Sequence, residues 1–179
     1  LWGAGVAALA LLLITASSWF SRRMVADTLA ERARRMFVTF LDLYQRSDPE
    51  TRLGILGRME NDLRRALVLR PADGELHFLK AYANYFQAQE AYLQSEAAAR
   101  AGEEAQAQLW KTQALSRCRL ALASLNVSLN EVRFHQSFHI RGKTYRLMAE
   151  LTGDPREILL ARRDLERAVS FTPAYHEGL

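Results

Sequence analysis

The chain has 179 residues, of which 49% are hydrophobic, with nine glycines, four prolines and a formal net charge of +4. This length suits one core-bearing domain or a short repeat array. Few helix breakers among many strong helix formers predict an all-α fold. The single cysteine, Cys118, excludes an intrachain disulfide framework and a Cys-based metal cluster, and we expect a buried, inert thiol. The sequence contains no basic patch interleaved with aromatic residues, which is the pattern that would indicate nucleic-acid binding.

The first twenty residues form an uncharged stretch long enough to cross a bilayer as one helix. We therefore predict a transmembrane helix at residues 1–20 in a single-pass protein of the bacterial plasma (inner) membrane. The alternative is a secretory signal peptide. The flanking arginines favour a cytoplasmic location for the domain that follows. Long domains translocate largely regardless of charge, however, so a periplasmic location is the alternative. The residues expected at the membrane interface are Trp2, Trp19, Phe20, Arg22 and Arg23.

Residues 21–47 are predicted to continue as a juxtamembrane amphipathic helical stalk. Its apolar side chains recur at three- and four-residue steps, which places them on one face. They are Val25, Leu29, Ala33, Met36, Phe37, Phe40 and Tyr44. Such a stripe needs a partner.

Residues 48–179 are predicted to form a helical domain. Asp48 and Pro49 begin its first helix, which ends before Pro71, and Asp73 begins the next, which continues to about Arg100. The second of these helices carries an aromatic face, which we interpret as core. Its members are Phe78, Leu79, Tyr82, Tyr85, Phe86 and Tyr92.

The segment 96–108 contains Gly102, and we predict a hairpin turn there; one continuous exposed helix is the alternative. The following helix is expected to fade at Asn126. Ser128 and Glu131 have the spacing of a capping box, which predicts a new helix to about Thr152. The last predicted helix begins at Asp154-Pro155 and ends at Thr172-Pro173.

Two of these helices share a small-large-small-large-Pro spacing. One reads Ala161, Leu165, Ala168, Phe171 and Pro173, and the other reads Met59, Leu63, Ala66, Leu69 and Pro71. This spacing resembles the second helix of the tetratricopeptide repeat (TPR), and residues 144–173 align with a whole repeat. The resemblance implies a TPR-like array of antiparallel helix pairs with overlong middle hairpins. Residues 174–179 resemble the start of another first helix, so we expect the array to continue, or to pack on a partner, beyond residue 179.

A cluster of polar residues on one helix is the candidate site. Glu131, His135 and His139 recur every four residues, as potential metal ligands on one face would, although Gln136 stands where the zinc-protease motif has its Glu. Lys143 and Arg146 continue this face, which favours a basic groove for an acidic partner. We therefore predict partner binding by His135, His139, Lys143 and Arg146, with Glu131, His135 and His139 as weak metal candidates.

From these observations we expect a non-enzymatic, membrane-anchored scaffold or adaptor subunit of a larger bacterial envelope complex. The resemblance implies docking of a peptide or partner helix on a TPR-like surface. The expected partners are the lipid bilayer and other protein subunits, without a cofactor, a nucleic acid or a small-molecule substrate. One alternative is an assembly factor or chaperone-like protein that binds clients, and a remote one is a metal-dependent enzyme using His135 and His139.

Overall fold

The computed structural model describes residues 2–131 and 135–171, with side chains described for residues 15–130 and 135–171. Within these ranges the chain forms six helices and no strand, which confirms the all-α prediction. The helices are α1 (Trp2–Leu43), α2 (Pro49–Leu69), α3 (Gly74–Arg100), α4 (Glu104–Glu131), α5 (His135–Thr152) and α6 (Pro155–Ser170).

The predicted membrane span is not found. Among the residues whose side chains are described, no helix is long and apolar enough to cross a membrane. Residues 1–14 of the predicted span lie outside that description. In the described part of α1 the uncharged run ends at Arg22 and Arg23, and Asp27 follows one turn later. The expected transmembrane helix and single-pass plasma-membrane location are therefore contradicted. Trp19 is exposed, with the Arg23 guanidinium 5.3 Å from the centre of its ring.

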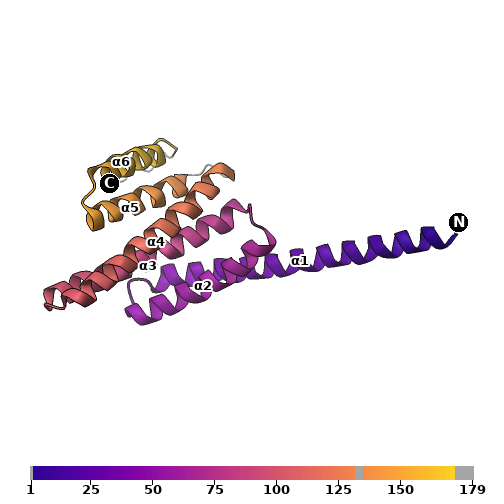
Figure 1. Ribbon diagram of the computed structural model, residues 1–179, viewed down its shortest axis with the longest axis horizontal. Coiled ribbons are helices and arrows are strands. Elements are labelled where there is room, and N and C mark those ends of the chain that lie inside the picture. The colour runs from indigo at the N-terminus through magenta and orange to yellow at the C-terminus, as the bar shows by residue number, and fades with distance from the viewer. Residues whose placement is uncertain (1, 132–134, 172–179) are drawn as a thin grey trace.

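The helices pack as three successive pairs, α1 with α2, α3 with α4 and α5 with α6. Neighbouring pairs meet through α2 and α3 and through α4 and α5, and the first helices also touch, α1 with α3 and α3 with α5. Figure 1 shows α1 projecting far beyond the other helices at its N-terminal end, while α6 lies at the edge of the array, beyond α5. The long α3–α4 hairpin forms the middle of the array.

The stripe predicted along residues 21–47 is buried on the chain's own helices. Leu29, Ala33 and Phe40 are at most 5% exposed and belong to the same apolar cluster as the buried faces of α2 and α3. Val25 is the exception, because it is half exposed and its neighbour Ala26 is buried instead. The partner that this stripe needs is therefore the α2–α3 region, and burial of these side chains stabilises the docked α1.

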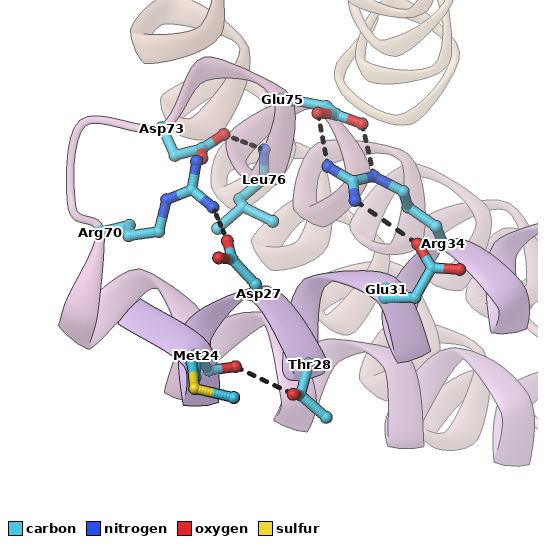
Figure 2. A network of polar contacts seen from close by, with 9 residues as sticks. All are labelled: Met24, Asp27, Thr28, Glu31, Arg34, Arg70, Asp73, Glu75 and Leu76. Atoms are coloured by element: carbon cyan, nitrogen blue, oxygen red, sulfur yellow. Dashed lines mark hydrogen bonds and ion pairs between the residues drawn. The ribbon is translucent and has the colours of Figure 1, made fainter. Parts of the chain in front are cut away.

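Ion pairs tie α1 to the turn between α2 and α3 (Figure 2). Arg70, at the end of α2, donates to Asp27 of α1 at 2.7 Å and also pairs with Asp73. Arg34 of α1 makes two 2.7 Å hydrogen bonds to the carboxylate of Glu75 at the start of α3. These side chains are partly exposed, so each pair contributes little energy, but together they favour one register of α1 against the turn.

The predicted N-caps of three helices are confirmed. Asp48, Asp73 and Asp154 each accept a hydrogen bond from a backbone N–H in the first turn of α2, α3 and α6. The predicted hairpin is confirmed as well, because α3 ends at Arg100 and Gly102 has a φ of 77°, which a glycine adopts without strain.

The predicted break between Asn126 and Glu131 is wrong. Helix α4 continues through this segment to Glu131, and Ser128 is buried inside it. The Ser128 hydroxyl lies 3.2 Å from the hydroxyl of Ser137 on α5, so it forms a contact between helices instead of capping one. Because a buried hydroxyl needs a hydrogen-bond partner, this pair fixes where α4 and α5 meet.

Small residues mark the crossing of α5 and α6. Ala161 and Ala168 are at most 5% exposed, as their small positions in the repeated spacing predicted. On α5, a Cβ added to Gly142 would lie 2.8 Å from Cγ of Leu165 and 3.0 Å from the carbonyl oxygen of Ala161. The backbones therefore approach closely here. Helix α6 ends at Ser170, and the predicted end at Thr172-Pro173 lies outside the described residues.

Candidate functional site

The candidate site is a groove of about 390 Å³ on the face formed by α1, α3 and α5, the first helix of each pair. We call it the α1–α3–α5 groove. Its lining residues are Phe37, Leu41, Phe78, Tyr82, His135, Gln136, His139, Ile140 and Lys143.

The wall from α1 and α3 is apolar. Phe37 and Leu41 are one helical turn apart on α1, and Phe78 and Tyr82 are one turn apart on α3, so each pair faces the same way. The rings of Phe37 and Tyr82 meet edge to face, with centroids 4.6 Å apart. Leu41 is 45% exposed. This wall can therefore accept apolar side chains without moving its backbone.

The wall from α5 is basic. His135, His139 and Lys143 recur every four residues and line the same groove, as the sequence predicted. Burial lowers the pKa of His139, and Lys143 and His135 lower it further. Burial also lowers the pKa of Lys143, with a smaller effect from Arg146. In the described part of the chain none of the three groove-lining bases is paired with a carboxylate, so a positive charge placed here is uncompensated.

Arg146, the fourth predicted residue, does not line this groove. It lies with Lys143 in a smaller hollow of about 160 Å³ that also contains Tyr44, Tyr85 and Glu150. Its guanidinium is 3.7 Å from the Glu150 carboxylate one turn away. The basic face is thus continuous in sequence but divided between two hollows, with Lys143 bordering both.

The metal hypothesis gains no support from the geometry. The side chain of Glu131 lies outside the described residues, so its distance from His135 and His139 is not part of the structure. Among the side chains that are described, no group of three or more His, Cys, Asp or Glu is placed to hold a metal ion.

Cys118 is buried among the packed helices, as predicted. Burial is the main cause that raises the pKa of its thiol to about 12, so the nucleophilic thiolate is scarce at neutral pH.

Six of the nine groove-lining residues were not predicted as site residues from the sequence. The sequence pattern assigned Phe37 to the stalk stripe and Phe78 and Tyr82 to the core, and it did not single out Leu41, Gln136 or Ile140 as site residues. The available signal was the extra width of the apolar face, since Leu41 lies one turn beyond Phe37 at the edge of the stripe.

Compared with known proteins, the chain matches no family model, no curated protein and no solved structure. Function has therefore to be inferred from the groove itself.

Proposed function

We propose that this chain is a non-enzymatic adaptor that docks an acidic, amphipathic segment of a partner protein in the α1–α3–α5 groove. The observation that carries the proposal is the opposition of two unlike walls, one aromatic and aliphatic from α1 and α3, the other basic from α5. A segment with apolar side chains on one face and carboxylates on the next would satisfy both walls.

The arrangement of helices supports a TPR-like array as the scaffold of this adaptor. The three pairs stack in chain order, and the first helices α1, α3 and α5 share one face. Arrays of this kind commonly present such a face as an extended binding surface. The long α3–α4 hairpin, of 27 and 28 residues, departs from a regular repeat.

The charge of the groove favours an acidic partner over a neutral one. Lys143 and the two histidines of α5 lie on one face of the helix without an acidic partner among the described residues, and burial disfavours the charged forms of His139 and Lys143. A carboxylate brought into the groove would relieve this repulsion and favour protonation. Docking should therefore weaken with salt, because exposed charge pairs are screened over about 8–10 Å at ordinary ionic strength.

The test begins with the chain as bait. Proteins captured in fixed ratio are divided into overlapping peptides, and the peptide that binds is titrated against purified variants. Lys143→Glu and Leu41→Lys change one wall each. Arg163→Glu is the matched control, since Arg163 is exposed on α6 and does not line the groove.

The proposal predicts that the peptide carries Asp or Glu beside apolar residues and that both groove variants weaken it about tenfold or more, whereas the control does not. Unchanged affinity in both groove variants would refute the proposal. Substoichiometric capture of many unfolded proteins, insensitive to these substitutions, would favour the client-binding alternative instead.

A further inference from the structure

Helix α6 carries an exposed apolar strip beside the face that packs on α5. Ile158 and Val169 are 58% and 45% exposed, and Leu165 is half-buried. With Ala161 they line a shallow hollow of about 520 Å³, which Arg146, Arg162 and Glu166 border. The apolar residues recur at three- and four-residue steps, so they form one continuous strip along the helix.

No other described helix covers this strip. The second helices of the first two pairs each meet the next pair, α2 through α3 and α4 through α5. Among the described residues α6 packs mainly on α5, and its Ala168 also joins a small cluster with Leu129 of α4. Figure 1 shows α6 at the edge of the array. An exposed apolar strip with charged borders is typical of an interaction surface.

The order of side chains along the strip is self-complementary. When a second α6 is laid antiparallel on the first about a two-fold axis near residues 163–164, Ile158 faces Val169 of the second copy. Arg162 then faces Glu166, and Leu165 lies close to the axis in both copies. Each contact occurs twice, because a two-fold axis repeats it.

We infer that this strip, composed of Ile158, Arg162, Leu165, Glu166 and Val169, is a homodimer interface in which α6 of one chain packs antiparallel on α6 of a second copy. The complementary charges set the orientation. A parallel arrangement would bring Arg162 against Arg162 and Glu166 against Glu166, and like charges in contact oppose association.

The size of the strip sets the strength of the dimer. Helix α6 has 16 residues, so it is about 24 Å long at 1.5 Å per residue. Stable interfaces bury about 800 Å² on each partner, more than one helix face of this length supplies. The dimer is therefore weak and its population depends on chain concentration. This interface is independent of the α1–α3–α5 groove.

The test measures the molar mass of the chain by analytical ultracentrifugation over a range of concentrations. The variants are Arg162→Glu and Glu166→Arg, each alone, and then the two mixed in equal amounts. Arg163→Glu is the matched control, because Arg163 is exposed on α6 but is absent from the strip. Helical circular dichroism checks each variant, since the substitutions also remove the 2.7 Å pair between Arg162 and Glu166 within one helix.

The wild-type chain and the control should show a concentration-dependent dimer. Each single variant sets like charges against each other in its own dimer and should dimerise about tenfold more weakly or worse. The mixture should restore the dimer, because two glutamates of one chain then face two arginines of the other. Ile158→Lys, which leaves the intrahelical pair intact, should also abolish it.

Three results would overturn the inference. They are a wild-type chain that stays monomeric at every concentration, single variants that dimerise as well as the wild type, and a mixture that does not recover the dimer although both variants remain helical.

Discussion

Gly142 offers a direct test of how closely α5 and α6 approach. An alanine Cβ at this position would lie 2.8 Å from Cγ of Leu165 and 3.0 Å from the backbone oxygen of Ala161. The leucine side chain can rotate away, but the carbonyl can move only if α6 moves. Overpacking of this kind costs about 1–3 kcal/mol, while replacing a helical glycine by alanine contributes about 1 kcal/mol of stability. We therefore expect Gly142→Ala to lower the free energy of unfolding by about 1 kcal/mol, taking the middle of these ranges.

Gly57→Ala is the matched control. Gly57 is also inside a helix, α2, and an added Cβ there meets nothing within 4 Å. Only the gain in helix propensity applies, so this variant should be stabilised by about 0.5–1 kcal/mol. In urea unfolding followed by circular dichroism, the two midpoints should differ by about 1 M. If Gly142→Ala is stabilised as much as Gly57→Ala, the helices do not approach as closely as described.

Two further predictions concern titratable groups. Burial, with Lys143 and His135, lowers the pKa of His139 below its ordinary 6.5 in the folded chain, so the unfolded chain binds more protons at mildly acidic pH. The free energy of unfolding should be independent of this group above about pH 7 and should fall as the pH is lowered below about 7. His139→Gln should reduce this fall in urea unfolding at a series of pH values, and an unchanged slope would contradict the assignment. Cys118 should not react with a thiol reagent at neutral pH until the chain unfolds, because burial raises its pKa to about 12; rapid labelling of the folded chain, monitored by mass spectrometry, would show the thiol to be accessible.

Local sequence signals predicted the helices well where one residue decides the structure. Asp48, Asp73 and Asp154 cap helices because a carboxylate beside the first turn satisfies free backbone donors, whatever the tertiary contacts. The same logic failed at Ser128, because the residue has two possible uses. Its hydroxyl could cap a helix or bond to another helix, and the contact with Ser137 depends on how α4 meets α5. Sequence spacing does not contain that information.

The site was predictable in part for a similar reason. His135, His139 and Lys143 lie on one helix, so their four-residue spacing brought them together correctly. The opposite wall is contributed by α1 and α3, which lie about 60 to 100 residues earlier in the chain. No local sequence pattern predicts that these residues lie opposite α5. The membrane prediction depended on the uncharged run of residues 1–20 and on the aromatic residues and arginines near its ends, and no membrane-spanning helix is found among the described side chains. Gly142 was overlooked, since a single glycine in a helix does not reveal the close approach of a second helix.

The chain-order pairing of the helices also determines how the molecule opens. Among the described helices, α6 packs mainly on α5, whereas α3 contacts helices on both sides. In a linear array the cost of releasing a unit is the loss of its contacts with its neighbours, so a helix with one main neighbour separates at a lower cost than a helix packed on both sides. Backbone amides of α6 would then exchange with deuterium through a local opening of low free energy, and those of α3 only through a much larger one. The helix that opens most easily is thus also the helix with the exposed apolar strip. A second copy bound to that strip would slow the hydrogen exchange of the α6 amides.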